Sequence, residues 1–200
     1  MRDCCNMETI IPLAVFAFAT SVTPGPNNLM LMASGVNFGF RRTLPHMLGV
    51  ALGFVFLAIL VGLGLAQIFE RWPILHTVLS ILSIAYLLWL AWRIANAAEP
   101  GEAREKSRPM TFLEAAAFQW VNPKVWAMAL PAVTIYAPGT GTTAVLTAAA
   151  VFGAINLPTV SSWCLLGTQL RRFLTNPKRL RIFNWTMAFL LVATLVPFVI

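Results

Sequence analysis

The chain has 200 residues, of which 58% are hydrophobic and only 10% are charged. Soluble domains carry about 25% charged residues, so this composition excludes an ordinary water-soluble protein. The three cysteines show neither a disulfide framework nor a metal-ligand spacing, and we expect no metal and no cofactor.

Six apolar segments follow one another along the chain, at 9–37, 44–69, 74–97, 111–136, 143–168 and 182–200. Each is compatible with a helix that crosses about 30 Å of hydrocarbon. The segments are longer than barrel strands and do not alternate between apolar and polar residues as such strands do. In lipid, a helix makes all of its backbone hydrogen bonds within itself. The sequence therefore predicts an all-α integral membrane protein with six transmembrane helices.

The basic residues are distributed unevenly between the connections. Eleven of the 14 lie after the first, third and fifth segments, at Arg41, Arg42, Arg93, Arg104, Lys106, Arg108, Arg171, Arg172, Lys178, Arg179 and Arg181. The positive-inside rule then places these connections in the cytoplasm and both termini outside, in the periplasm of a bacterium. Membrane lipids explain this pattern, so the net charge of +7 predicts no nucleic-acid partner.

The first segment contains an interruption near its middle, at Pro24, Gly25, Pro26, Asn27 and Asn28. Proline has no backbone N–H, so carbonyls one turn earlier lose their helical partners. Such groups are tolerated at membrane depth only inside protein or beside a wet cavity. The new helix N-terminus after the break favours an anion such as a carboxylate, and the asparagine amides add donors and acceptors. A plain structural kink is the alternative.

The fourth segment has a similar interruption at Asn122, Pro123 and Lys124. Lys124 lies thirteen residues from the start of its segment, too deep to reach a surface easily. A charge at that depth indicates a functional site, and no carboxylate lies near it in the spans. We expect the ammonium to face freed carbonyls, amide oxygens and water, or the carboxylate of a solute. A lysine that only braces the break is the alternative.

The two interrupted segments open two halves of the chain and run in opposite directions. Interruptions at corresponding places in two halves are the best sequence indication of a transporter's central site. We therefore predict two inverted three-helix repeats at 1–98 and 111–200, joined by a cytoplasmic linker at 99–110.

Further polar residues are weaker candidates. Gln119 lies within one turn of Asn122, and Asn156 interrupts the fifth segment beside Pro158. His46 and His76 fall near the ends of predicted spans, where interfacial polar roles are favoured. An enzyme would need a nucleophile and a base at membrane depth, which only Lys124 with Ser161 or Ser162 could supply, so no catalytic site is predicted.

The stretches "TPGPNNLMLMASGVNFGFRRTLPHMLGVALGF", "AYLLWLAWRIA" and "FQWVNPKVWA" resemble the lysine exporter (LysE/RhtB-type) family, from about Ile10 to the last segment. The resemblance implies a six-helix exporter in the bacterial inner membrane that moves amino acids or small derivatives outward as a proton-coupled antiporter. Within the family, the run TPGPNN favours the branch of cysteine/O-acetylserine exporters.

The sequence fits proton coupling poorly, because no Asp or Glu lies deep in a span. Either Lys124 or Glu114, near the cytoplasmic end, would have to carry the proton. An exporter of another small solute and an uncoupled channel stay open as alternatives, and so does a homodimer.

Overall fold

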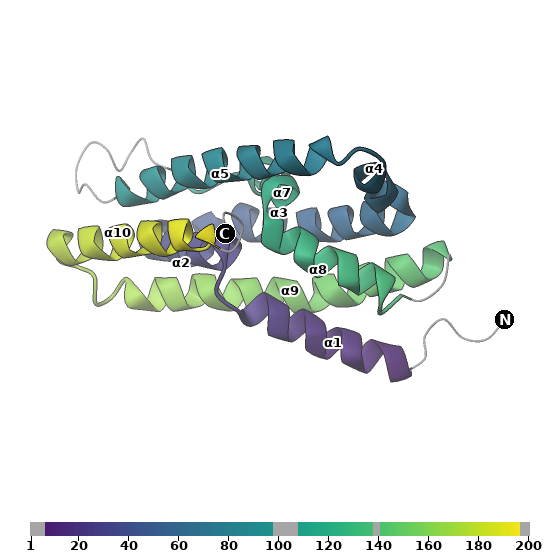
Figure 1. Ribbon diagram of the computed structural model, residues 1–200. Helices are drawn as coiled ribbons and strands as arrows, with labels where there is room; N and C mark the ends of the chain where they lie inside the picture. Colours follow the sequence, from purple (N-terminus) through teal and green to yellow (C-terminus); the bar gives the residue numbers. More distant parts are fainter. Residues whose placement is uncertain (1–6, 98–107, 138–140, 197–200) are drawn as a thin grey trace.

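The computed structural model describes residues 7–97, 108–137 and 141–196, and within these ranges every regular element is a helix (Figure 1). The elements are α1 (Met7–Val22), α2 (Pro26–Phe38), α3 (Phe40–Leu60), the π-helical turn η1 (Val61–Leu65), α4 (Ala66–Arg71), α5 (Ile74–Ala95), α7 (Phe112–Val121), α8 (Pro123–Thr134), α9 (Thr142–Leu170) and α10 (Pro177–Ala193). Most of the predicted linker 99–110 lies outside the described residues.

Three helical stretches are long and apolar enough to cross a bilayer, by length and composition. They are Phe40–Phe69, Thr77–Ala95 and Thr142–Leu170. The pair Thr9–Val22 and Pro26–Phe38, bent by 56°, makes a fourth if it is one span. The other described helices are shorter, since α7, α8 and α10 have 10, 12 and 17 residues. The all-helical membrane architecture is confirmed, and the predicted number of six spans stays a prediction.

Both predicted interruptions are present as helix boundaries. α1 ends at Val22 and α2 begins at Pro26, after an extended Gly25 with φ −174° and ψ 176°. α7 ends at Val121 and α8 begins at Pro123, with the intervening Asn122 also in an extended conformation. In both places a proline occupies the first helical position, where its missing N–H is not needed.

The helices pack mainly across the two predicted halves of the chain. α2 lies along α9, α3 lies along both α7 and α9, and α5 lies along α10 (Figure 1). The approach of α2 to α9 is close, because a Cβ atom on Gly35 would overlap the backbone oxygen of Cys164. A Cβ atom on Gly167 would likewise overlap that of Met32. Glycine at such crossings is typical of helices that associate in lipid.

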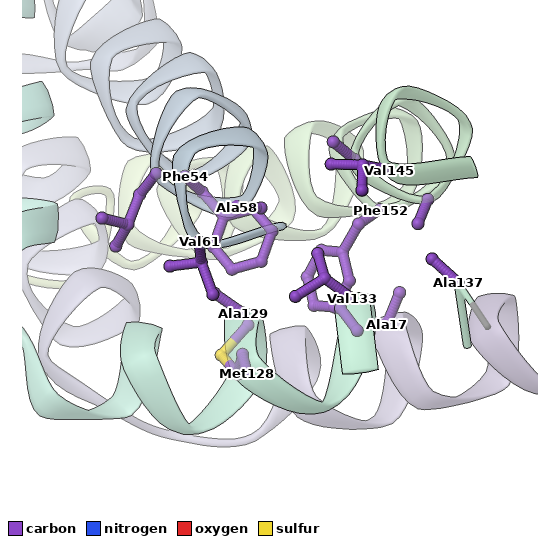
Figure 2. Packing of buried hydrophobic residues seen from close by; sticks show 14 of the residues in the cluster. Ala17, Phe54, Ala58, Val61, Met128, Ala129, Val133, Ala137, Val145 and Phe152 are labelled. Atoms are coloured by element: carbon purple, nitrogen blue, oxygen red, sulfur yellow. The ribbon is translucent and has the colours of Figure 1, made fainter. Parts of the chain in front are cut away.

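An apolar cluster fills the space between α1, α3, α8 and α9 (Figure 2). The rings of Phe54 and Phe152 stack across α3 and α9 with centroids 4.2 Å apart. Ala17 of α1 and Ala129 of α8 are both 0% exposed and let these two short helices approach the rings. This packing brings the end of α1 and the start of α8, and hence the two breaks, to one place in the fold.

Basic residues gather at one end of the bundle, which we call the basic end. There α5 and α9 finish and α10 begins (Figure 1). The junction of α2 and α3 lies at the same end, since a Cβ atom on Gly39 would lie 3.4 Å from the guanidinium of Arg171. The described basic residues of these segments are Arg41, Arg42, Arg93, Arg171, Arg172, Lys178, Arg179 and Arg181.

Candidate functional site

Side chains next to the first break replace the helical hydrogen bonds that the prolines remove. The hydroxyl of Thr23 donates to the carbonyl oxygen of Thr20 at 2.8 Å, the oxygen that a residue in place of Pro24 would have bonded. The amide Nδ2 of Asn28 donates to the carbonyl oxygens of Ser21 and Thr23, at 2.7 and 2.8 Å. Asn28 is 3% exposed, so its amide holds the break from inside the protein.

The second break is satisfied in a similar way by different residues. The indole Nε1 of Trp126 donates to the carbonyl oxygen of Trp120 at 2.8 Å. The hydroxyl of Ser83, on α5, donates to the carbonyl oxygen of Val121. Both acceptors belong to the last turn of α7, whose helical partners are lost where Pro123 starts a new helix. Ser83 therefore fixes α5 to this break.

Lys124 connects the two breaks. Its ammonium Nζ donates to the carbonyl oxygen and to the hydroxyl of Thr23, both at 2.7 Å, and lies 3.5 Å from the carbonyl oxygen of Pro24. The contact with Pro24 is at the limit of a hydrogen bond, so one of the three ammonium donors is weakly used. A Cβ atom on Gly25 would lie 2.7 Å from Cδ and 3.0 Å from Nζ of Lys124, so glycine lets the side chain lie against the break.

A small cavity of about 20 Å³ lies between the breaks. Six of the predicted site residues line it, namely Gly25, Asn27, Asn28, Asn122, Lys124 and Asn156, together with residues that include Thr20, Ser21, Phe54 and Met128. This volume holds about one water molecule. Lys124 is the only charged residue in the described lining, so the field in the cavity favours an anionic group.

Two buried polar atoms at this cavity have no partner in the described part of the chain. They are the hydroxyl of Ser21 and the amide Nδ2 of Asn122, whose residues are 3% and 1% exposed. The oxygen Oδ1 of Asn122 is used, because it caps α8 by accepting from the backbone N–H of Lys124 at 3.2 Å. An unmade hydrogen bond of this kind costs about 1–3 kcal/mol, so each atom is ready for a ligand or a water.

Gln119 belongs to the site through Asn27, with which it forms a reciprocal amide pair. Nδ2 of Asn27 donates to Oε1 of Gln119 at 2.8 Å, and Nε2 of Gln119 donates back to Oδ1 of Asn27 at 3.3 Å. Nε2 also donates to the carbonyl oxygen of Ala115 at 2.6 Å. The pair therefore ties the first turn of α2 to α7, next to the cavity.

The structure thus brings the ten predicted site residues to the two breaks and the cavity between them. Pro24, Pro26 and Pro123 shape the backbone and do not line the cavity, and Gln119 contacts it through its partner. Four further contributors were not predicted from the sequence, namely Ser21, Thr23, Ser83 and Trp126. Only Thr23 had a local signal, because it directly precedes Pro24, whereas Ser83 lies on a distant helix.

The alternative Ser–Lys pair is not formed. The hydroxyl of Ser161 donates to the carbonyl oxygen of Leu157 at 2.7 Å, and that of Ser162 donates to Thr159 at 2.6 Å. Both hydroxyls therefore bond their own helix, and Lys124 bonds Thr23 instead. Within the described ranges, His, Cys, Asp and Glu side chains form no group of three or more that could hold a metal ion.

Three relatives of this chain among known proteins carry the same name. The chain is 29% identical over 180 residues to the cysteine/O-acetylserine efflux protein of Klebsiella pneumoniae, covering 88% of this chain and 90% of that protein. It is 33% identical over 113 residues to the protein of the same name from Escherichia coli K12, and 32% identical over 111 residues to that of Salmonella typhi. These two shorter matches cover 55% of this chain and 56% of each relative. No solved structure matches the chain.

A family model agrees with these relatives. The model described as LysE type translocator matches residues 18–200, which include both helix breaks and the residues that join them. The sequence resemblance to the lysine exporter family is therefore confirmed. This chain is a multi-pass membrane protein and belongs to the family of LysE-type translocators.

Proposed function

We propose that the protein exports a small amino acid or amino-acid derivative across the bacterial inner membrane. The solute binds between the two helix breaks, at Lys124. The observation that carries this proposal is the cavity between the breaks, where one charged side chain meets two buried polar atoms that have no partner among the described residues. The names of the relatives support cysteine and O-acetylserine as the first solutes to test.

The chemistry of the site fits a zwitterion. The ammonium of Lys124 and the uncapped backbone N–H groups at the start of α2 attract a carboxylate. Nδ2 of Asn122 is a further donor beside them. At the other end of the solute, carbonyl oxygens of the opened α1 turn and the hydroxyl of Ser21 accept from an ammonium group. A solute without an anionic group would leave Lys124 uncompensated.

The size of the cavity implies a conformational change during transport. About 20 Å³ holds one water and no amino acid, so the helices at the breaks must separate before a solute binds. The bonds from Lys124 to Thr23 join the two breaks directly. We propose that a solute carboxylate takes the place of Thr23 as the partner of Lys124, which releases α1 from α8.

The proposed architecture has six spans in two inverted repeats. It is supported by the two interrupted helix pairs and by the packing of α2 with α9, of α3 with α7, and of α5 with α10. In each pairing, a helix of the first half meets one of the second. The proposed orientation puts the basic end in the cytoplasm and both termini outside, which follows the positive-inside rule.

The orientation is tested by cysteine labelling in intact cells, in a variant without the native cysteines. Gly141 precedes α9 at the opposite end from Asn176, which caps α10 at the basic end. An impermeant maleimide should label Gly141→Cys and should label Asn176→Cys only after the membrane is opened. The reverse pattern would invert the proposed topology.

We propose that export is coupled to proton movement in the opposite direction. The support is chemical, since Lys124 is the one titratable side chain lining the described cavity. In this scheme the amine of Lys124 takes up and releases the proton during the transport cycle, and only its protonated form holds the solute carboxylate. Collapse of the proton gradient should then stop export against a concentration gradient, whereas a channel would equilibrate the solute regardless.

The function itself is tested by export from cells that overproduce the protein. Cells are loaded with a panel of amino acids, and the medium is analysed over time for the wild type and for Lys124→Met at matched membrane abundance. We expect accumulation of cysteine or O-acetylserine that is lost in Lys124→Met. Full export by Lys124→Met would remove the assignment of Lys124, and no export of any amino acid would favour another solute or a channel.

A further inference from the structure

A second and larger cavity lies at the basic end, separate from the cavity between the breaks. Its volume is about 400 Å³, and the two cavities share no lining residue. The walls come from the second half of α2, the start of α3, the end of α5 and residues 108–110. The volume falls within the range of about 300–1,000 Å³ that is typical of small-molecule sites.

His46 of α3 lines this cavity and has an unusual environment. The residue is 2% exposed, and neither Nδ1 nor Nε2 has a hydrogen-bond partner within the described ranges. The expectation of an interfacial polar role for His46 is therefore wrong, because α3 turns this residue into the protein. A buried imidazole without partners is destabilising, and proteins keep such groups where a ligand or water completes them.

Two neutral polar side chains of the cavity wall, Ser34 and Asn37, are already paired. The hydroxyl of Ser34 shares a hydrogen bond with that of Thr43 at 2.9 Å. Nδ2 of Asn37 donates to Oδ1 of Asn184 at 3.0 Å. Among these three neutral side chains, His46 is therefore the one that can still hydrogen-bond a ligand or a water in the cavity.

The charges around the cavity favour an anionic group. Arg93 lines it, with its guanidinium carbon 4.8 Å from the ring centroid of Trp89. Arg108 lines it as well and is held by Glu114 through two bonds of 2.7 Å. The described lining contains no carboxylate, so Arg93 has no acidic partner there.

We propose that this cavity is an access site that binds the amino-acid solute before it reaches the breaks. The carboxylate faces Arg93, and the free ring nitrogens of His46 hydrogen-bond the polar end of the solute. The inference rests on the proposed export function and adds a second binding site to it. The solute class is a small zwitterion with an uncharged side chain, since Leu90 and Met30 give the cavity an apolar wall.

The test uses inside-out membrane vesicles, in which the basic end faces the medium in the proposed topology. Uptake of radiolabelled O-acetylserine and cysteine gives KM from the external concentration. His46→Leu should raise KM at least fivefold with little change in maximal rate. His46→Gln, which keeps a donor and an acceptor, should recover part of the affinity. Leu52→Ala, on the exposed face of α3, is the control and should leave KM unchanged.

Thermal unfolding of the purified variants separates binding from a structural role. Because His46 has no described partner, His46→Leu should unfold at the same temperature as the wild type or higher. A lower unfolding temperature with unchanged KM would overturn the inference and make His46 a structural residue. If the wild type transports and Lys124→Met does not, an unchanged KM in His46→Leu refutes the access site alone. If the wild type transports neither solute, the access site for them fails together with the proposed function.

Discussion

Gly25→Ala is the substitution that tests the role of the first break most directly. The added Cβ atom would lie 2.7 Å from Cδ and 3.0 Å from Nζ of Lys124, where carbon atoms normally approach to about 3.5–4.0 Å. The lysine side chain therefore has to retreat by about 1 Å. Its Nζ atom bonds Thr23 at 2.7 Å, so the displacement takes these bonds to or beyond the limit of a hydrogen bond.

The expected effect on the fold is small. Gly25 has an extended backbone that alanine adopts freely, and the residue that must move is the end of a flexible side chain. A compatible replacement of glycine by alanine even stabilises a protein by about 0.4–1 kcal/mol through the unfolded state. We therefore expect the unfolding temperature of Gly25→Ala to stay close to that of the wild type.

The expected effect on transport is large. A hydrogen bond to a charged group contributes about 1.5–3 kcal/mol. If a displaced Lys124 loses one such bond to the solute carboxylate, export at low solute concentration falls roughly 10- to 100-fold. Gly141→Ala is the matched control, because no atom of the described residues, apart from its chain neighbours, lies within 4 Å of the Cβ it would add.

The assay is the initial rate of export from loaded cells at equal membrane abundance of each variant, beside thermal unfolding of the purified proteins. Slow export by Gly25→Ala with normal unfolding supports a working lysine at the break. Wild-type export by Gly25→Ala would refute the reasoning, because Lys124 would then have been displaced without consequence.

Three further substitutions test how the helices are held. Ser83→Ala removes the donor to the carbonyl oxygen of Val121 and should lower the free energy of unfolding by about 1–3 kcal/mol; an unchanged denaturation curve would mean that water replaces the hydroxyl. Gly35→Ala forces α2 away from the backbone of Cys164 and should abolish a monodisperse peak in size-exclusion chromatography, so a normal peak would contradict the packing. Thr111→Ala removes the hydroxyl that caps α7 and should destabilise by about 0.5–2 kcal/mol, read by thermal unfolding; no change would show that the cap contributes nothing.

The sequence alone determined the class of protein and the positions of both breaks. Hydrocarbon offers no partner to a backbone group, so long apolar segments must be helices whatever their neighbours are. The effect of Pro24 and Pro123 is equally local, since a proline removes its own N–H in any surroundings. The position of Lys124 in the middle of its segment likewise follows from counting residues, and a charge at such a position predicts a functional site.

The tertiary structure alone decided which groups meet. Thr23 and Lys124 are 101 residues apart in the chain, and Asn27 and Gln119 are 92 residues apart. These contacts depend on which helices are neighbours and on which face of each helix meets the other. A local sequence pattern cannot predict this where the helices are apolar all the way round. His46 shows this clearly: its place near the end of a predicted span suggested an interfacial role, and only the orientation of α3 in the bundle buries it. In lipid both faces of a helix are apolar, so facing is decided by packing and hydrogen bonding rather than by hydrophobicity.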